Sequence, residues 1–335
     1  MPPTALAAIV HQSALVTLAD LKEADRENRQ ASIAESTKRA YAADLRRFCA
    51  WAEQHGFRGF PATAETVGLY LAALQAKGRK PATIKRALAS ICATHRAAGL
   101  PVPGDSVRVK AAMKGINNRA ARLAEETGEP IRDQAAALSV ADVVAMVTAL
   151  PDTVRGLRDR AIVLLGVTGA FRRSEIARLH VRNVAFTEEG IRVHVMRSKT
   201  DQRGDGRVVG IVTQPNPRAC PVRALTAYQE AADVAEGFLF RSITNALTVS
   251  ERRISDVGVS RAVKRAAKAA GIEKQVGRIS AHSLRASAAT IAISKGKRAD
   301  AVQRLGGWRS AVSMAPYIRE GELFGDDNAT VGLLG

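Results

Sequence analysis

Residues 191–212 read IRVHVMRSKTDQRGDGRVVGIV, and this stretch decides the fold class of the second half of the chain. In IRVHVM (191–196) and again in RVVGIV (207–212), apolar residues alternate with others, which is the pattern of a half-buried β-strand. The charged, glycine-containing stretch between them is turn-forming. The pattern therefore predicts a β-hairpin, with Lys199 on its turn, in a domain that is otherwise helical.

Helical patterns lie on both sides of this hairpin. Ser139 is a candidate N-cap for the first helix, because a serine hydroxyl can accept a hydrogen bond from the first turn. The expected helices span 139–150, 156–168, 221–233 and 255–271, followed by a last group from His282 to the C-terminus. These patterns predict a helical α+β domain with a small antiparallel β-hairpin or sheet.

The first half of the chain shows only helical periodicity. One buried face is expected along 37–51, at Tyr41, Leu45, Phe48 and Cys49. Further helices are expected over 64–75, 81–98 and 106–117. Basic residues cluster on the side away from the core, which suits a solvated face as well as a binding face. They are Lys38, Arg39, Arg46, Arg47, Lys85 and Arg86.

A chain of 335 residues has the length of two domains. We expect an N-terminal extension over 1–33, a helical domain over 34–118, an interdomain linker over 119–137 and a second domain over 138–335. The linker RAARLAEETGEPIRDQAAA mixes charge with glycine and proline and lacks an apolar period, although its length allows part of it to be helical.

The charge balance favours a polyanionic partner. Lys and Arg total 50 against 32 Asp and Glu, so the formal net charge is +18. Cations that neutralise phosphates release condensed counterions, so an excess of this size is typical of proteins that bind DNA or RNA. A basic protein without such a partner is the alternative on charge alone. The 46% hydrophobic content excludes global disorder.

The absence of several catalytic and cofactor-binding motifs from the sequence narrows the reactions that it could catalyse. The sequence has no GxxxxGK[ST], GxGxxG, HExxH or GxSxG, and no spaced carboxylates of the kind that hold Mg²⁺. Cys49, Cys92 and Cys220 are far apart, which argues against a zinc site or a disulfide framework. No signal peptide or apolar membrane span is found. We therefore expect a cytoplasmic, nucleoid-associated protein that needs neither a metal nor a cofactor.

Basic side chains in the second half could supply the chemistry at a phosphate. TGAFRRSEI (168–176) places Arg172 just after an apolar helix, with Glu175 three positions on. HSLR (282–285) puts His282 and Arg285 on one face of a helix, where both can point at one group. Each of these has a structural alternative, such as a surface ion pair.

Two aromatic residues complete the set. LGGWRS (305–310) ends a helix in two glycines, which we expect to expose Trp308, and Tyr317 follows in MAPYIRE. Singly, either could be a core aromatic. Together with the four residues above and Lys199, and in this order, they resemble the tyrosine site-specific recombinases, the phage integrase family. The resemblance runs from about Thr37 to the end, and the position of Trp308 is often histidine in the family.

The resemblance implies a mainly helical fold, with an N-terminal four- to five-helix SAM-like core-binding domain and an α+β catalytic domain. It implies a site-specific DNA recombinase that works without a metal, through a 3′-phosphotyrosyl intermediate and a Holliday junction. A homotetramer would act on two pseudo-palindromic sites with inverted-repeat half-sites, and the C-terminal NATVGLLG (328–335) would dock into a neighbouring protomer. Two alternatives stay open: DNA relaxation like that of type IB topoisomerases, and a non-catalytic DNA-binding regulator.

The resemblance also implies a role for each matched residue. Tyr317 is the nucleophile, Lys199 protonates the leaving oxygen, and Glu175 orients the basic groups. The phosphate is held by Arg172, Arg285, His282 and Trp308, and His282 also takes the tyrosine proton. The residues implied to contact DNA elsewhere are Arg39, Lys85, Arg86 and Arg261.

Overall fold

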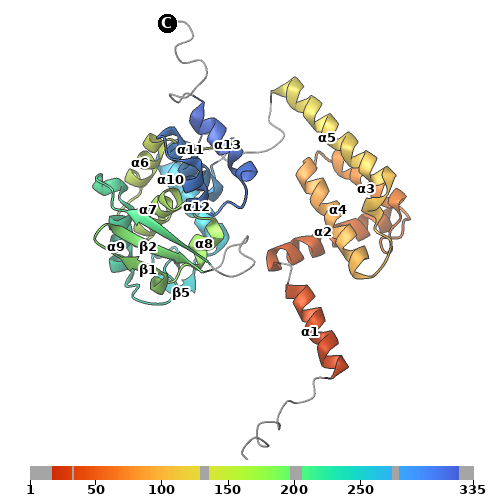
Figure 1. Cartoon of the computed structure of the whole chain (residues 1–335), viewed down its shortest axis with the longest axis horizontal. Helices are drawn as coiled ribbons and strands as arrows, with labels where there is room; N and C mark the ends of the chain where they lie inside the picture. The colour runs from red at the N-terminus through yellow and green to blue at the C-terminus, as the bar shows by residue number, and fades with distance from the viewer. Residues whose placement is uncertain (1–16, 32–33, 129–135, 197–205, 274–278, 324–335) are drawn as a thin grey trace, which may run out of the picture. The chain divides into compact units, whose positions relative to one another are not determined.

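The computed structural model describes residues 17–31, 34–128, 136–196, 206–273 and 279–323, drawn in colour in Figure 1. The chain divides into two compact units, Met1–Arg132 and Asp133–Gly335. The division falls within the stretch 119–137 that the sequence predicts as a linker. Lys199 and the C-terminal segment 328–335 lie outside the described residues.

The first unit is helical throughout its described residues. Its elements are α1 (Leu18–Ala31), α2 (Glu35–Gln54), α3 (Ala64–Ala76), α4 (Pro81–Ala97), the 3₁₀ turn η1 (Pro103–Asp105) and α5 (Val107–Thr127). Thr63 and Ser106 cap α3 and α5 by accepting hydrogen bonds from the first-turn backbone. The core lies among α2, α3, α4 and α5, and its fully buried side chains include Phe48, Leu71 and Ile84. The four helices predicted from the periodicity are therefore confirmed.

Two helical segments of this unit differ from the prediction. Helix α1 lies in the predicted extension, where no helix was expected, and α5 continues ten residues past 117 into the linker, part of which was expected to allow a helix. Both segments are rich in Ala, Leu, Glu and Arg, which favour a helix without any apolar period. The last buried residue of α5 is Ile116, so periodicity could not reveal the final turns. Helix α5 ends at Gly128, whose φ of 69° suits a left-handed C-cap.

The second unit has α7 (Val154–Thr168) at its centre, with residues 161–166 completely or almost completely buried. Helices α9, α10 and α11 pack against α7. The remaining helical elements are shorter, apart from α13. The helices in chain order are α6 (Val140–Thr148), α7, α8 (Arg173–Arg178), η2 (Val181–Asn183), η3 (Pro217–Ala219), α9 (Pro221–Ala232), α10 (Asp256–Ala269), α11 (Ala281–Ser294), α12 (Ala299–Gly306) and α13 (Ala311–Glu322). Ser139 caps α6 in a capping box with Asp142, as its position predicts.

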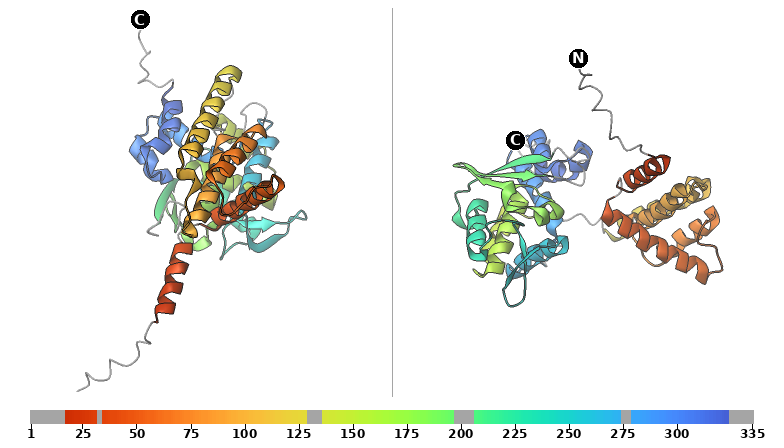
Figure 2. Two further views of the ribbon diagram at one scale, coloured as in Figure 1. Left: turned by 90° about the vertical axis from the view of Figure 1, so that its right-hand side faces the viewer. Right: turned by 90° about the horizontal axis from the view of Figure 1, so that it is seen from below.

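A three-stranded antiparallel sheet lies against one side of these helices (Figures 1 and 2). Its order is β1 (Val184–Phe186), β2 (Gly190–Val195) and β3 (Arg207–Val212), and β2 pairs with β3 so that Val195 faces Arg207. The predicted hairpin is thus confirmed. Its inward side chains, such as Val193 and Val209, join the same core as α7 and α9.

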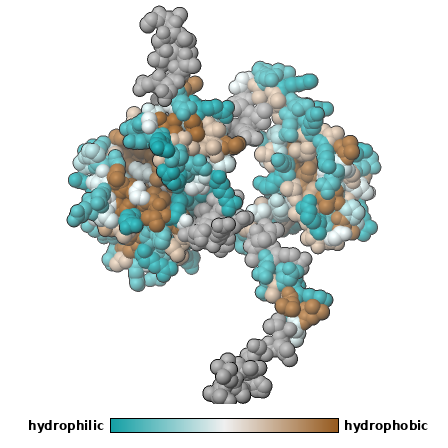
Figure 3. Space-filling view, viewed as in Figure 1, coloured by the Kyte–Doolittle hydropathy of each residue, from teal (hydrophilic) through white to brown (hydrophobic). Residues whose placement is uncertain are grey.

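Three short strands were missed. Strand β1 has three residues, and β4 (Arg241–Ile243) and β5 (Val249–Arg253) form a separate two-stranded sheet without a buried alternating face. Val208 and Val212 are exposed on the outer side of the three-stranded sheet, and Figure 3 shows hydrophobic residues on the surface of this unit. Among the helices of the described ranges, none has the length and apolar character needed to cross a membrane.

Candidate active site

The site begins at the turn between α7 and α8. Helix α7 ends at Thr168, and Arg172 takes the N-cap position of α8. The Glu175 carboxylate accepts a hydrogen bond from the Arg172 backbone N–H at 2.9 Å and from Arg172 Nη1 at 2.7 Å. A Cβ at Gly169 would lie 2.3 Å from the buried Phe171 ring, so the turn requires glycine there. Arg172 and Glu175, three positions apart, therefore form an N-terminal capping arrangement as well as an ion pair.

Arg207, which the sequence analysis missed, is a second partner of Glu175. Its Nη1 donates to Glu175 Oε1 at 3.2 Å and its Nη2 donates to Oε2 at 3.0 Å. Its guanidinium lies over the Phe171 ring, 5.7 Å from the centroid. We call Glu175, Arg172 and Arg207 the Glu175 cluster. The only signal in the sequence is a basic residue opening the strand after the Lys199 turn.

Glu175 is held ionised in a buried place. Its side chain is 1% exposed. Burial alone would raise its pKa, but the charge of Arg207 and hydrogen bonds from Arg207 and Arg172 outweigh this effect and hold the pKa below its ordinary value. The cluster therefore keeps one carboxylate between two guanidinium groups.

Arg285 on α11 is the most deeply buried cation near this cluster. It is 2% exposed, and its Nη1 donates to the carbonyls of Ala170 and Gly306, each at 2.6 Å. Its guanidinium lies 3.7 Å from the centroid of the Trp308 ring, within the range of a cation–π contact. Burial, with the nearby charge of Arg172, lowers the pKa of Arg285 to about 9, so the group stays cationic at neutral pH.

Trp308 is buried rather than exposed, which corrects the expectation from the glycine pair. The residue is only 8% exposed and packs with Met314 and Val302. The two glycines let the chain fold back over the indole: a Cβ at Gly306 would lie 1.9 Å from Trp308 Cζ3, and Gly307 has a φ of 61°. The ring thus supports Arg285 from one side.

Tyr317 and His282 face each other across α13 and α11. Tyr317 Oη lies 3.0 Å from His282 Nε2, and the Tyr317 ring is 6.1 Å from the Trp308 ring. Burial raises the pKa of Tyr317, and the charge of Arg285 opposes this effect. His282 has an exposed face, but partial desolvation within the site and the charges of Arg285 and Arg172 lower its pKa. At neutral pH His282 is therefore uncharged and can accept a proton from the tyrosine hydroxyl.

The structure thus brings six of the predicted catalytic residues together from α8, α11, α13 and the turns beside them. They are Arg172, Glu175, His282, Arg285, Trp308 and Tyr317. With Arg207, the arrangement sets three guanidinium groups against one carboxylate, beside a hydroxyl with a basic partner, and could hold and attack a phosphodiester. In the part of the chain that the structure describes, no three His, Cys, Asp or Glu side chains group to hold a metal ion.

The four residues expected to contact DNA are on other helices. Arg39 is exposed on α2, Lys85 and Arg86 are exposed on α4, and Arg261 is exposed on α10. Arg86 is also tied by a two-pronged ion pair to the buried Asp44 of α2, at 2.7 and 3.2 Å.

Asp44 has a further arginine partner. Arg47 Nη1 donates to Asp44 Oδ1 at 3.0 Å, from one turn along the same helix. We call Asp44, Arg47 and Arg86 the Asp44 cluster. Its carboxylate is 5% exposed in the side chain, so the ion pairs fix both cations on the surface of α2 and α4.

Comparison with known proteins identifies the family. Residues 137–322 match the phage integrase family, and residues 28–98 match the phage integrase N-terminal SAM-like domain. The chain is 32% identical over 299 residues to the integrase/recombinase xerD homolog of Selenomonas ruminantium, which covers 88% of this chain and 85% of that protein. This chain belongs to the phage integrase family of tyrosine recombinases and is a site-specific recombination enzyme.

A second relative bears on the position within the family. Tryptophan at position 308 predicts a particular likeness to the Cre recombinase of Escherichia phage P1. The chain is 29% identical to Cre over 174 residues, covering 52% of this chain and 50% of Cre. The match to the xerD homolog is longer, so the particular likeness to Cre stays a prediction.

Solved structures share the fold at low identity. A lambda integrase fragment bound to DNA superposes with a TM-score of 0.59 at 18% identity, over 92% of this chain and 96% of that one. A lambda integrase tetramer bound to a Holliday junction gives a TM-score of 0.58 at 15% identity, over 96% and 82%. These matches agree with the helical, two-domain fold class predicted from the sequence.

Proposed function

We propose that this enzyme is a site-specific DNA recombinase, which cuts and rejoins strands through a 3′-phosphotyrosyl intermediate without a metal ion. The observation that carries the proposal is the 3.0 Å contact between Tyr317 Oη and His282 Nε2, beside the buried Arg285. A hydroxyl with a basic partner at a cationic site is the arrangement that nucleophilic attack on a phosphodiester requires.

In the first step Tyr317 Oη attacks the scissile phosphorus and gives its proton to His282. The bond from phosphorus to the 5′-oxygen breaks, and Lys199 donates a proton to that oxygen. The products are a tyrosine–phosphate ester at the 3′ end and a free 5′-hydroxyl. Because the ester keeps the phosphoryl group activated, rejoining needs no nucleotide cofactor. Attack by the 5′-hydroxyl of a partner duplex reverses the step and leads, after one strand pair, to a Holliday junction.

The cations of the site stabilise the charge that develops on the phosphate. Arg172 and Arg285 bind the non-bridging oxygens, and their fixed planar donors suit that geometry better than a lysine ammonium does. Both are partly or wholly desolvated, which strengthens their effect on the transition state. Trp308 donates its indole N–H to the same phosphate, and Glu175 orients Arg172.

The partner in this proposal is double-stranded DNA at two pseudo-palindromic sites, where a homotetramer assembles. The net charge of +18 and the exposed Arg39, Lys85 and Arg261 support binding to the duplex. The tetramer of lambda integrase on a Holliday junction has the same fold, which supports this assembly. The C-terminal segment 328–335 would link neighbouring protomers. The proposal also places the enzyme with its DNA, in the cytoplasm at the nucleoid.

A nicked suicide substrate tests the proposal. Duplexes that the full chain selects from a random pool of inverted repeats are nicked a few nucleotides beyond the cleavage position, so that the short fragment carrying the new 5′-hydroxyl diffuses away after attack. We expect a covalent protein–DNA adduct with the wild-type chain and none with Tyr317→Phe. Absence of any adduct with bound DNA would favour the non-catalytic regulator. Relaxation of supercoiled plasmids without strand exchange between selected sites would favour the topoisomerase alternative.

A further inference from the structure

Arg207 occupies a junction between the active site and the hairpin. It is the first residue of β3 and pairs in register with Val195, where the hairpin leaves toward Lys199. Its side chain turns from the strand to the Glu175 carboxylate of α8. A residue of the hairpin therefore contacts the group that orients Arg172.

The side chain of Arg207 is confined on several sides. It is 15% exposed, and the Phe171 ring lies beneath its guanidinium. A Cβ at Gly307 would lie 3.1 Å from Arg207 Nη1, so the αL glycine leaves room for it. Both terminal nitrogens of Arg207 donate to the Glu175 carboxylate. Within the described residues, its buried Nε has no hydrogen-bond partner.

The charges explain why a second arginine is needed. With Arg172 alone, the buried Glu175 would neutralise the cation that it orients. Arg207 adds a second positive charge on the same carboxylate, so the Glu175 cluster keeps a net positive charge. Burial makes this compensation strong, because little solvent screens the three groups.

We propose that Arg207 is a positioning residue of the strand-cleavage step, which holds and neutralises Glu175 so that Arg172 is oriented yet keeps its charge for the phosphate. The inference rests on the proposed function. The contact between Arg207 and Glu175 also anchors the start of β3, one strand of the hairpin that leads to Lys199, to the active-site carboxylate.

A purely structural ion pair is the competing explanation. The same unit contains one of this kind: Asp159, 1% exposed, accepts hydrogen bonds from Arg158 and Arg265 and links α7 to α10. A structural pair lowers the melting temperature when it is broken, and leaves the rate of the folded fraction unchanged.

The test compares single-turnover adduct formation at saturating DNA for the full-length wild type, Arg207→Gln, Arg207→Lys and the double variant Arg207→Gln with Glu175→Gln. At metal sites, loss of the partner that orients a ligand typically costs about 10- to 100-fold. We expect a loss of this size for Arg207→Gln, with DNA affinity almost unchanged, and a smaller loss for Arg207→Lys. The double variant should be faster than Arg207→Gln, since removing the carboxylate charge releases Arg172.

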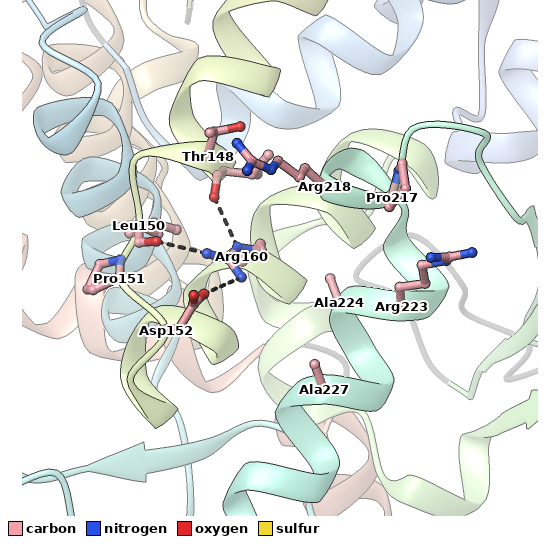
Figure 4. A pocket seen from close by; sticks show the side chains of 11 residues that line it. Thr148, Leu150, Pro151, Asp152, Arg160, Pro217, Arg218, Arg223, Ala224 and Ala227 are labelled. Carbon is pink, nitrogen blue, oxygen red and sulfur yellow. Dashed lines mark hydrogen bonds and ion pairs between the residues drawn. The ribbon is translucent and has the colours of Figure 1, made fainter.

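Arg160 supplies the matched control. Its side chain is 18% exposed, and it donates to Asp152 and to the carbonyls of Val147 and Leu150 at 2.8–2.9 Å in a pocket of the same unit (Figure 4). Arg160→Gln should lower the melting temperature and leave the rate of adduct formation unchanged.

Several outcomes would overturn the inference. One is an Arg207→Gln rate equal to that of wild type. Another is a double variant no faster than Arg207→Gln. If Arg207→Gln does not fold, a wild-type rate in Arg207→Lys overturns it. Failure of the wild type itself to form an adduct would reject the proposed function, whereas a reactive wild type with an equally reactive Arg207→Gln rejects this inference alone.

Discussion

The Asp44 cluster of the first unit and the Glu175 cluster of the second each hold a buried carboxylate between two arginines, but they differ in how far the arginines reach solvent. In the Asp44 cluster the side chains of Arg47 and Arg86 are 68% and 48% exposed. In the Glu175 cluster those of Arg172 and Arg207 are 21% and 15% exposed. The same pairing therefore presents cations on a surface in one unit and encloses them at the candidate active site in the other.

The difference in exposure predicts a difference in function. Exposed cations are screened by salt and contribute to the affinity for a polyanion. Enclosed cations are little screened by salt and stabilise the charge that develops on one phosphate in the transition state. We therefore expect the Asp44 cluster to affect DNA binding and the Glu175 cluster to affect the rate of cleavage.

The largest effect is expected from Arg285, which stands beside the Glu175 cluster. Arg285→Lys keeps a charge but loses the planar guanidinium that lies over Trp308 and donates to the carbonyls of Ala170 and Gly306. Removing one fixed donor to a transition-state oxyanion costs about 10²- to 10³-fold in rate. Single-turnover adduct formation at saturating DNA should fall by that amount with little change in DNA affinity. A rate within a factor of about two of wild type would contradict the enclosed role.

Gly306→Ala should have the next largest effect, because its Cβ would overlap the Trp308 ring that supports Arg285. Overpacking of this kind costs about 1–3 kcal/mol of unfolding free energy. Thermal unfolding and the cleavage rate should both decline. Gly210→Ala is the matched control, since nothing lies within 4 Å of the Cβ that it adds. Equal melting temperatures for the two variants would show that the indole is not held as described.

Arg86→Ala should have a smaller effect of a different kind. It removes one exposed cation of the Asp44 cluster, and Arg47 still pairs with the carboxylate. The slope of log Kd against log salt concentration should become shallower by about one if Arg86 contacts a phosphate. The cleavage rate at saturating DNA should not change. A rate loss without a change in salt dependence would place Arg86 with the enclosed cations instead.

The smallest predicted effect concerns His282, which should change the unfolding free energy and its dependence on pH. Its pKa lies below the ordinary value because partial desolvation and neighbouring arginines disfavour the charged ring. The unfolded chain takes up this proton first, so the unfolding free energy should fall as the pH drops through about 6.5. His282→Gln should remove that part of the decline. An NMR titration of the full chain with a His282 midpoint at or above 6.5 would contradict the prediction.

Sequence patterns predicted the fold best where they depend on neighbours along the chain. The β2–β3 hairpin and the cap of α6 were predicted because alternation and capping are local. Strand β1 was missed because three residues cannot show a period. Helix α1 was not predicted and α5 exceeded its predicted bounds, because propensity, without burial, stabilises their exposed turns.

In the candidate site, too, contacts between residues close in the sequence could be predicted, and contacts between distant residues could not be predicted from local patterns. Arg172 and Glu175 are close because they are three apart, and the resemblance to a family ordered the more distant residues. Arg207 lies 32 positions from Glu175, and nothing in its neighbourhood distinguishes it from other arginines. Its pairing depends on the packing of β3 against α8. Trp308 was expected to be exposed because the glycines indicate a turn, but they cannot indicate which side of the turn packs.

The most direct test of the comparison measures DNA affinity and single-turnover adduct formation for Asp44→Asn and Glu175→Gln on the same nicked duplex. We predict that Asp44→Asn weakens binding, with a wild-type rate at saturating DNA, and that Glu175→Gln slows the reaction, with near wild-type affinity. Circular dichroism would establish that both variants are folded. If Asp44→Asn slowed the saturated reaction, or Glu175→Gln changed affinity alone, the assignment of binding to one cluster and chemistry to the other would be contradicted.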